Sequence, residues 1–518
     1  MTVSKLDQTL RDESLATRLA NEAKDAGLVL CHWKSNQRLD LSVQGKTDLD
    51  MSIPPEQESR LRVLLKDLGF IEFRSRPWQH YAGVTDWLGA DPVTGIMLHL
   101  HLHTRLLTGA KAIKEQDLPW LELMNAEVAP DPVTGINIPP KAFEAHLLLT
   151  REAIKSLNLR GQILTLKQGG IPVTRESRVE MTWLLKQCSD EEIERWGIML
   201  WGSERWKRMK PDFKDEILWS NSQFRRLRTE ISTSLAPHRS GTALGHSARF
   251  ITMRFTSYLH KFQARLDSTT SSGKHVIGHR APIIAIVGSD GAGKSTVTAN
   301  LLKWLSWKAD VTMVYFGTNH GWFRRLRSAI LRIKPSKNIA QPASHLDKQT
   351  TKTIHPRSSF PLWLQAVKWA VMARVRLHFQ RKGQRLSCNG TIILADRYPQ
   401  TEVKGTYDGP SRLDIVGLGV LGRFLQRYEH RVYKKITSTQ PDLVIKLIAP
   451  LEVALERKPD HDSDAIAAKV ELTRSIMFGG APIVEIDAAK PLDEVLTEVR
   501  RHVWSVIRVT AEEKRALP

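Results

Sequence analysis

The segment Gly288–Ser295 reads G-S-D-G-A-G-K-S, and its residue types are suited to holding phosphate groups. It matches the pattern G-x-x-x-x-G-K-[S/T], in which glycines permit a tight turn whose backbone N–H groups surround phosphate oxygens. The lysine of this pattern reaches the outer phosphates, and the final hydroxyl can hold Mg²⁺. We therefore predict a site for ATP and Mg²⁺. Its phosphate-binding residues would be Gly288, Ser289, Asp290, Gly291, Ala292, Gly293, Lys294, Ser295 and Thr296.

A second candidate pair, Asp396 and Arg397, directly follows the apolar run Ile392–Ala395. An aspartate at the carboxyl end of a buried parallel strand faces the crevice in which ligands bind. Asp396 could hold Mg²⁺ or its waters together with Ser295, while Arg397 could bind a phosphate through its forked guanidinium. The alternative is a solvated strand end with an ordinary salt bridge.

A third candidate site combines carboxylates with histidines near the N-terminus. Asp48 and Asp50 lie two residues apart in the strand-like segment Thr47–Ile53, so both would project from one face. The later segment Ile96–His103 alternates leucine and histidine, which also places its three imidazoles on one face. If the two strands are neighbours, Asp48, Asp50 and His101 could bind one divalent metal, and such ligands suit Mn²⁺ or Zn²⁺ better than Mg²⁺. A polar strand face in contact with water would satisfy the same pattern.

The elements around the glycine-rich segment alternate between short apolar runs and helical patterns. Such alternation predicts an α/β fold with a parallel sheet and helices on both faces, because strands buried on both sides read as continuous apolar runs. The predicted strands are Ile283–Val287, Val311–Phe316, Ile392–Ala395, Leu443–Ile448 and Ile483–Ile486.

The remainder of the chain has a different texture. Residues 1–138 predict a mixed α/β domain, with strands at Leu28–Cys31, Thr47–Ile53 and Ile96–His103 and a helix at Glu58–Leu68. Residues 139–267 predict a basic helical region, 268–280 a polar linker, and 281–510 the α/β domain described above.

Composition limits the class of protein. Hydrophobic residues make up 41% of the 518 residues and charged residues 25%, which excludes a disordered chain. The net charge of +21 favours phosphate-bearing partners, including nucleic acid. The three cysteines are far apart and the first residues are polar, so we predict a cytoplasmic protein. The sequence contains no uninterrupted run of about 18 apolar residues, so we predict no membrane span. Nothing in the sequence indicates the oligomeric state.

The C-terminal motifs resemble the thymidylate kinase family of P-loop kinases. The similarity rests on GSDGAGKST, ADRY and PDLVIKLIAPLEVALERK and covers about residues 281–508. It implies that Arg457, with Lys458 as a second candidate, begins a lid over the donor phosphates. It also implies an acceptor-binding arginine at Arg374 or Arg376.

Two departures from that family concern the acceptor. The connection Gly317–Phe360 is long, and residues 321–382 hold fourteen Lys or Arg and a single acid, Asp347. The loop after ADRY reads PQTEVKGTYDGPSRLD, which is not the family's usual serine- and glutamine-bearing acceptor loop. These differences argue against thymidylate itself. The basic segment is either a solvated face or a site for a more anionic acceptor, nucleic acid or a protein partner.

Residues 15–155 resemble the nucleotidyltransferase superfamily, in which a small-residue turn precedes a D-x-D strand. Here Lys34-Ser35 stands where the superfamily has Gly-Ser, and histidines of Ile96–His103 would replace the third acidic ligand. The resemblance implies a nucleotidyltransferase-like domain and a second transfer activity.

We therefore expect ATP- and Mg²⁺-dependent phosphoryl transfer to a nucleotide or another phosphorylated small molecule. Lys294, Asp396, Arg397 and Arg457 are the expected catalytic residues, acting through positioning and charge neutralisation. The alternative is an ATP-hydrolysing switch or assembly module that acts on nucleic acid or a protein partner.

Overall fold

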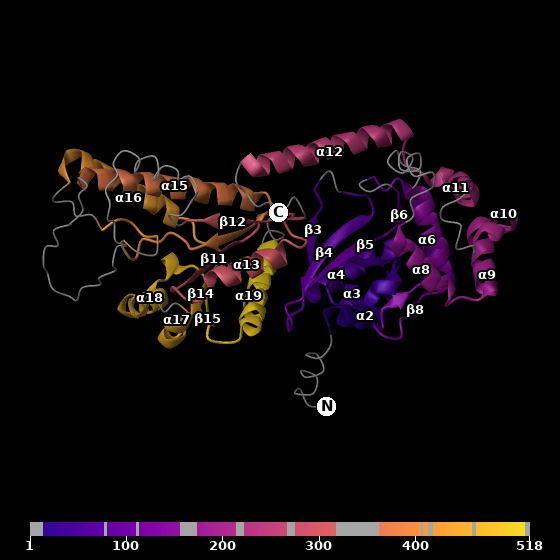
Figure 1. Ribbon diagram of the computed structural model, residues 1–518, viewed down its shortest axis with the longest axis horizontal. Coiled ribbons are helices and arrows are strands. Elements are labelled where there is room, and N and C mark those ends of the chain that lie inside the picture. Colours follow the sequence, from indigo (N-terminus) through magenta and orange to yellow (C-terminus); the bar gives the residue numbers. More distant parts are fainter. Residues whose placement is uncertain are drawn as a thin grey trace, which may run out of the picture. The chain divides into compact units, whose positions relative to one another are not determined.

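The computed structural model divides into two compact units, Met1–Gln263 and Ala264–Pro518 (Figure 1). It describes residues 14–76, 80–109, 113–155, 174–213, 222–266, 275–316, 362–405, 408–412, 418–457 and 463–512. The predicted boundary at residue 138 lies inside the first unit, and most of the predicted linker lies outside the described residues. Lys458 also lies outside the described residues. Of the basic segment 321–382, only residues 362–382 are described.

The N-terminal unit is built on a mixed sheet with the strand order β3-β4-β5-β2-β1-β9-β8. These strands are β1 (Cys31–His32), β2 (Leu49–Ser52), β3 (Ile71–Arg74), β4 (Val84–Ala90), β5 (Met97–His103), β8 (Ala129–Pro130) and β9 (Asn137–Ile138). The predicted strands Thr47–Ile53 and Ile96–His103 are direct neighbours, because β2 pairs with β5 in parallel and places Asp50 opposite His101. On the other side β5 pairs antiparallel with β4, which places Asp86 opposite the same histidine.

Helices cover this sheet and extend it into an all-helical part. α2 (Leu15–Asp25) and α4 (Glu58–Asp67) bury Leu19 and Leu65 in the core beside the central strands. A second core joins strand residues such as Trp33 to α6 (Lys141–Lys155), α8 (Arg175–Leu185), α9 (Asp190–Trp201), α10 (Ser203–Phe213) and α11 (Ser222–Ser234). Because this core is shared, the predicted mixed domain and helical region form one unit. α12 (Ala243–Leu266) follows them in the chain.

The C-terminal unit has a five-stranded sheet in the order β12-β13-β11-β14-β15, and every pair in it is parallel. The strands are β11 (Ile283–Gly288), β12 (Val311–Tyr315), β13 (Ile392–Asp396), β14 (Leu443–Ile448) and β15 (Ile483–Asp487). All five match the predicted runs to within a residue or so, and the predicted α/β class is confirmed. The three central strands, β11, β13 and β14, are buried along almost their whole length, as their continuous apolar sequences require.

Helices pack on both faces of this sheet. α15 (Leu362–Cys388) and α16 (Gly419–Thr437) lie together on one side, and α13 (Lys294–Leu305) and α19 (Leu492–Glu512) lie on the other (Figure 1). The rings of Trp304 and Trp504 meet edge to face between α13 and α19. α17 (Leu451–Arg457) and α18 (Ser463–Ser475) follow β14 in the chain. Among the described residues, no helix is long and apolar enough to cross a membrane.

Candidate functional site

The glycine-rich segment forms a tight loop between β11 and the first turn of α13. Gly291 and Gly293 have φ angles of +84° and +82°, a left-handed conformation that favours glycine. A Cβ atom on Gly291 would lie 2.6 Å from the carbonyl oxygen of Ala454, so that position has no room for a side chain. Lys294 Nζ donates to the carbonyl oxygen of Ser289 at 2.6 Å and so folds back over the loop. The loop and the amino end of α13 together offer backbone N–H groups and a basic side chain to an anion.

Asp396 and Arg397 lie beside this loop because β13 pairs directly with β11. The register places Ile286 opposite Asp396, so the carboxylate sits at the carboxyl edge of the sheet. Burial raises the pKa of Asp396 above its ordinary value, although the charges of Arg397 and Lys294 oppose that effect. Burial also lowers the pKa of Lys294 to about 8. Arg397 has a φ of +71°, and such strain in a non-glycine residue is frequent at functional sites.

One further contact of the loop was not foreseen from the sequence. Lys469 of α18 places Nζ 2.5 Å from Asp290 Oδ2, inside the predicted phosphate-binding segment. Burial alone would raise the pKa of Asp290. The hydrogen bond and the charge of Lys469 outweigh this effect, so the pKa lies below its ordinary value. No motif surrounds Lys469, so its approach to the loop emerges only when α18 is placed.

A cavity of about 90 Å³ lies over the loop. Its lining contains the predicted residues Gly288, Asp290, Lys294 and Arg397, and adds Val287, Tyr398, Asp408, Lys469 and Phe478. The cavity is therefore rich in cations and has two carboxylates, which is the chemistry expected of a pocket for a phosphorylated ligand and its counter-ions.

The structure separates the two candidate acceptor arginines. Arg374 is exposed, whereas Arg376 is buried and places Nη2 2.5 Å from Asp408 Oδ1. Arg376 also donates to the carbonyl oxygen of Phe316 and to the hydroxyl of Tyr433. Asp408 lies 3.9 Å from Arg397 Nη1 as well. Arg376 therefore holds the loop that lines the cavity and has its donors occupied within the protein.

Arg457, the expected lid residue, lies at the end of α17 and close to the loop. Its Nη1 donates to the carbonyl oxygen of Ala488 at 3.0 Å and lies 3.5 Å from that of Gly291. Its role as a lid residue stays a prediction, and the residues directly after it lie outside those described.

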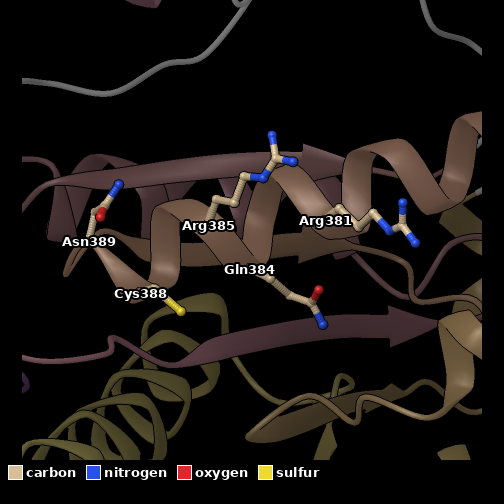
Figure 2. Close-up of a pocket in the computed structure, with 5 residues that line it drawn as sticks. All are labelled: Arg381, Gln384, Arg385, Cys388 and Asn389. Carbon is tan, nitrogen blue, oxygen red and sulfur yellow. The ribbon is translucent and has the colours of Figure 1, made fainter.

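A separate open hollow lies at the end of α15, where it is lined by Arg381, Gln384, Arg385, Cys388 and Asn389 (Figure 2). Figure 2 shows the side chains of Arg385 and Cys388 pointing to different sides of the helix. These groups therefore do not converge on a common point, as the groups of a ligand site would.

The N-terminal candidate residues also come together, in an order that the sequence did not reveal. Asp50 Oδ1 lies 2.9 Å from Lys34 Nζ, 3.4 Å from His101 Nδ1 and 3.5 Å from His103 Nε2. Asp48 instead contacts His99, whose Nδ1 lies 2.9 Å from Asp48 Oδ1. The two carboxylates therefore share a strand face but meet different imidazoles.

Asp86 is a third carboxylate in this cluster, and no sequence signal marked it. Its Oδ1 lies 3.0 Å from His101 Nε2 and 3.2 Å from His99 Nε2. Asp86 stands alone between Thr85 and Trp87 in β4, so only the pairing of β4 with β5 brings it to the histidines. Lys34 was singled out as an unusual turn residue, and the structure shows it as the ion-pair partner of Asp50.

The electrostatics of the cluster follow from burial and mutual charge. Burial would raise the pKa of Asp50, but the nearby Lys34 ammonium and the imidazoles hold it well below the ordinary value. Burial lowers the pKa of His103 to about 4. Burial would also lower that of His101, yet its contacts with Asp50 and Asp86 raise it to about 9. The pKa of Lys114 falls to about 7 through burial and repulsion from Lys34.

Comparisons with known proteins place the chain in a family. It is 32% identical over 252 residues to the "uncharacterized ATP-binding protein YghR" of Escherichia coli strain K12. The aligned region covers 48% of this chain and 96% of that protein. It is 31% identical over 231 residues to the "uncharacterized ATP-binding protein YghS" of the same strain, covering 43% of this chain and 93% of that protein. No family model matches the chain. The chain therefore belongs to the family of YghR and YghS, and the matched segment takes up about half of its length.

Proposed function

We propose that the unit Ala264–Pro518 binds ATP and transfers its γ-phosphoryl group to a nucleotide or another phosphorylated small molecule. The observation that carries the proposal is the convergence of the glycine loop, Lys294 and Arg397 on one cavity, next to Asp396 at the carboxyl edge of a parallel sheet. The names of YghR and YghS, which describe them as ATP-binding proteins, support the first half of the proposal.

Each residue of the site has a distinct task in this proposal. The loop amides and Lys294 bind the donor phosphates, and the Ser295 hydroxyl with Asp396 would hold Mg²⁺, which supplies positive charge beside them. Arg397 faces the same cavity and binds the transferring or accepting phosphate. Arg457, next to the loop, closes over the donor. Phosphoryl transfer asks for alignment and charge neutralisation more than for covalent chemistry, and these groups supply both.

The cavity favours an acceptor that already carries a phosphate. Arg397 is a cation beyond those that the donor requires, and it lies within 3.9 Å of Asp408, whose other oxygen is bound by Arg376. Ser411 donates through both its N–H and its hydroxyl to Glu429 of α16 at 2.7 Å, which fixes the same loop from a second helix. A loop fixed in this way holds Arg397 at a defined position for an anionic acceptor.

The test is transfer from labelled ATP to a panel of nucleoside monophosphates, nucleosides and sugar phosphates. Lys294→Met should lower transfer by about 10²–10³-fold, since it removes charge from the reacting phosphate. Lys303→Met is the matched control, because Lys303 lies on the same helix and is exposed. Transfer by a folded Lys294→Met protein within threefold of wild type would contradict the proposal. Hydrolysis of ATP without transfer to any acceptor would support the alternative of a switch or assembly module.

Nucleotidyl transfer by the N-terminal unit stays a prediction based on its resemblance. It is checked by incubating the protein with labelled nucleoside triphosphates and looking for a product that carries the nucleotide. Asp50→Asn should abolish that product and leave the transfer that depends on Lys294 unchanged.

A further inference from the structure

Asp50, His101 and His103 present one ligand atom each to a common point in the N-terminal unit. They lie on the paired strands β2 and β5, and their ligand atoms are all within 4.8 Å of one another. The two imidazole nitrogens are 3.4 Å and 3.5 Å from the same carboxylate oxygen, Asp50 Oδ1. The backbone sets this arrangement, because Asp50 is directly opposite His101 in the ladder and His103 lies two residues further along the same face.

These separations match those between ligands of a tetrahedral metal ion. With bonds of about 2.0–2.1 Å to nitrogen and oxygen, a tetrahedral Zn²⁺ keeps neighbouring ligand atoms about 3.4 Å apart. An octahedral ion with bonds of similar length, such as Mg²⁺, would need neighbouring ligands at about 3.0 Å and prefers oxygen donors. Two imidazoles and one carboxylate are also a common ligand set for divalent transition metals.

A second and independent observation is the state of His103. Its side chain is 3% exposed, its buried Nδ1 has no hydrogen-bond partner, and its buried Nε2 has only the long 3.5 Å contact with Asp50 Oδ1. Leaving buried polar atoms unpaired costs free energy, and each such case in a folded protein calls for an explanation. A metal bound at Nε2, the nitrogen that faces Asp50, would satisfy one of these atoms.

A third observation is how His101 is oriented. Its Nε2 lies 3.0 Å from Asp86 Oδ1, and that contact turns Nδ1 toward Asp50. Histidines that bind metals usually donate their other N–H to a carboxylate, which fixes the ring and makes the ligating nitrogen more basic. The ring of His99 contacts that of His101 edge to face. His99 is itself held by Asp48 and Asp86, so its ring helps to fix the position of the His101 ring.

We propose that Asp50, His101 and His103 bind a divalent transition metal of the Zn²⁺ type in tetrahedral geometry, with the fourth position open to water or substrate. Asp86 orients the ring of His101. Asp48 is not a metal ligand in this proposal, and it holds the neighbouring ring of His99 in place. This site is independent of the function proposed for the other unit. It also differs from the all-carboxylate Mg²⁺ chemistry that a D-x-D strand alone would suggest.

Lys34 has a specific place in this proposal. Its ammonium lies 2.9 Å from Asp50 Oδ1 and balances the charge of this half-buried carboxylate when no metal is present. A bound metal competes with that ammonium for the same oxygen. Removing the lysine charge should therefore strengthen metal binding, whereas an ordinary ion-pair network without a metal would gain nothing from its loss.

The experiment measures Zn²⁺ binding to the full chain by competition with a chromophoric chelator, and the visible spectrum of the Co²⁺ form. We expect wild type to bind one Zn²⁺ ion. In Asp50→Asn and in His103→Gln the affinity of this site for Zn²⁺ should be lower by about 10²-fold or more. Lys34→Met should bind Zn²⁺ at least as tightly as wild type. Co²⁺ should give the intense absorption of a tetrahedral site, and a large excess of Mg²⁺ should not displace it.

His238→Gln is the matched control, because His238 is an exposed histidine of the same unit. Equal Zn²⁺ stoichiometry and affinity in wild type, Asp50→Asn and His103→Gln would overturn the proposal, and so would the weak Co²⁺ spectrum of an octahedral site. If His103→Gln does not fold, Asp50→Asn alone decides, with its fold checked by circular dichroism. Transfer that depends on Lys294 should be unchanged in every variant, so failure of this proposal is distinguishable from failure of the proposed function.

Discussion

His146 provides a quantitative test of how the N-terminal unit is packed. It lies in α6, is fully buried, and its Nε2 is 3.0 Å from the carbonyl oxygen of Ile193. Trp201 Nε1 donates to the other ring nitrogen, His146 Nδ1, at 3.4 Å. One N–H donor and one acceptor are what a neutral imidazole offers, so protonation would leave a buried N–H facing the Trp201 donor. Burial lowers the pKa of His146 to about 4, although the bond to Ile193 opposes the shift.

The pKa shift translates into a loss of stability in acid. The unfolded chain, with an ordinary histidine pKa of about 6.5, takes up a proton before the folded protein does. The contribution of His146 is therefore fully present above about pH 6.5 and is lost as the pH falls toward the folded pKa of about 4. The difference corresponds to about 3 kcal/mol of unfolding free energy below pH 4, and about 2 kcal/mol at pH 5.

The assay is denaturant unfolding of wild type and His146→Gln between pH 5 and pH 8. Glutamine does not titrate, so the variant should be less stable than wild type at pH 8 and should lose less stability on acidification. His32 and His103 also have lowered pKa values, but they are present in both proteins and cancel in the difference. The exposed His238 serves as control, and His238→Gln should follow wild type at every pH. Parallel pH profiles for wild type and His146→Gln would refute the reasoning.

Three further predictions concern the C-terminal unit. Gly291→Ala should weaken nucleotide binding and lower the melting temperature more than Gly293→Ala, because both incur about 1–2 kcal/mol of left-handed strain but only the first Cβ meets backbone atoms. Calorimetry with ATP and thermal melting compare the two, and equal effects would contradict the loop geometry. Arg376→Met should cost about 3–5 kcal/mol in unfolding free energy, because it strands the buried Asp408, and a loss below 1 kcal/mol would show that the pair is not formed. Arg457→Ala should lower kcat for transfer by about 10²-fold with little change in the KM for ATP, and steady-state kinetics with an unchanged kcat would exclude a lid role.

Much of the C-terminal site could be predicted because its parts are local in the chain. The loop, the helix that follows it and the strand before it lie within one short segment, and each position has a residue type that the turn itself requires. Asp396 could be added because carboxyl ends of parallel strands share one edge of a sheet. Lys469 and the pairing of Arg376 with Asp408 could not, since each depends on where a distant helix packs against the sheet.

The N-terminal cluster shows the same division more sharply. The two-residue period of a strand determined from sequence that Asp48 and Asp50 lie on one face of their strand. It likewise determined that His99, His101 and His103 lie on one face of theirs. Which carboxylate meets which imidazole was decided by the ladder register, which sets Asp50 against His101 and brings Asp86 from a third strand.

The sequence by itself thus determined the α/β class, the phosphate-binding loop and the faces of the strands, because each follows from the conformation of a few consecutive residues. The tertiary structure alone decided the partners of Asp50, the carboxylate of Asp86 and the burial of His103. The physical reason is that hydrogen-bonded pairing and core packing join residues far apart in the chain, and no local pattern records that pairing.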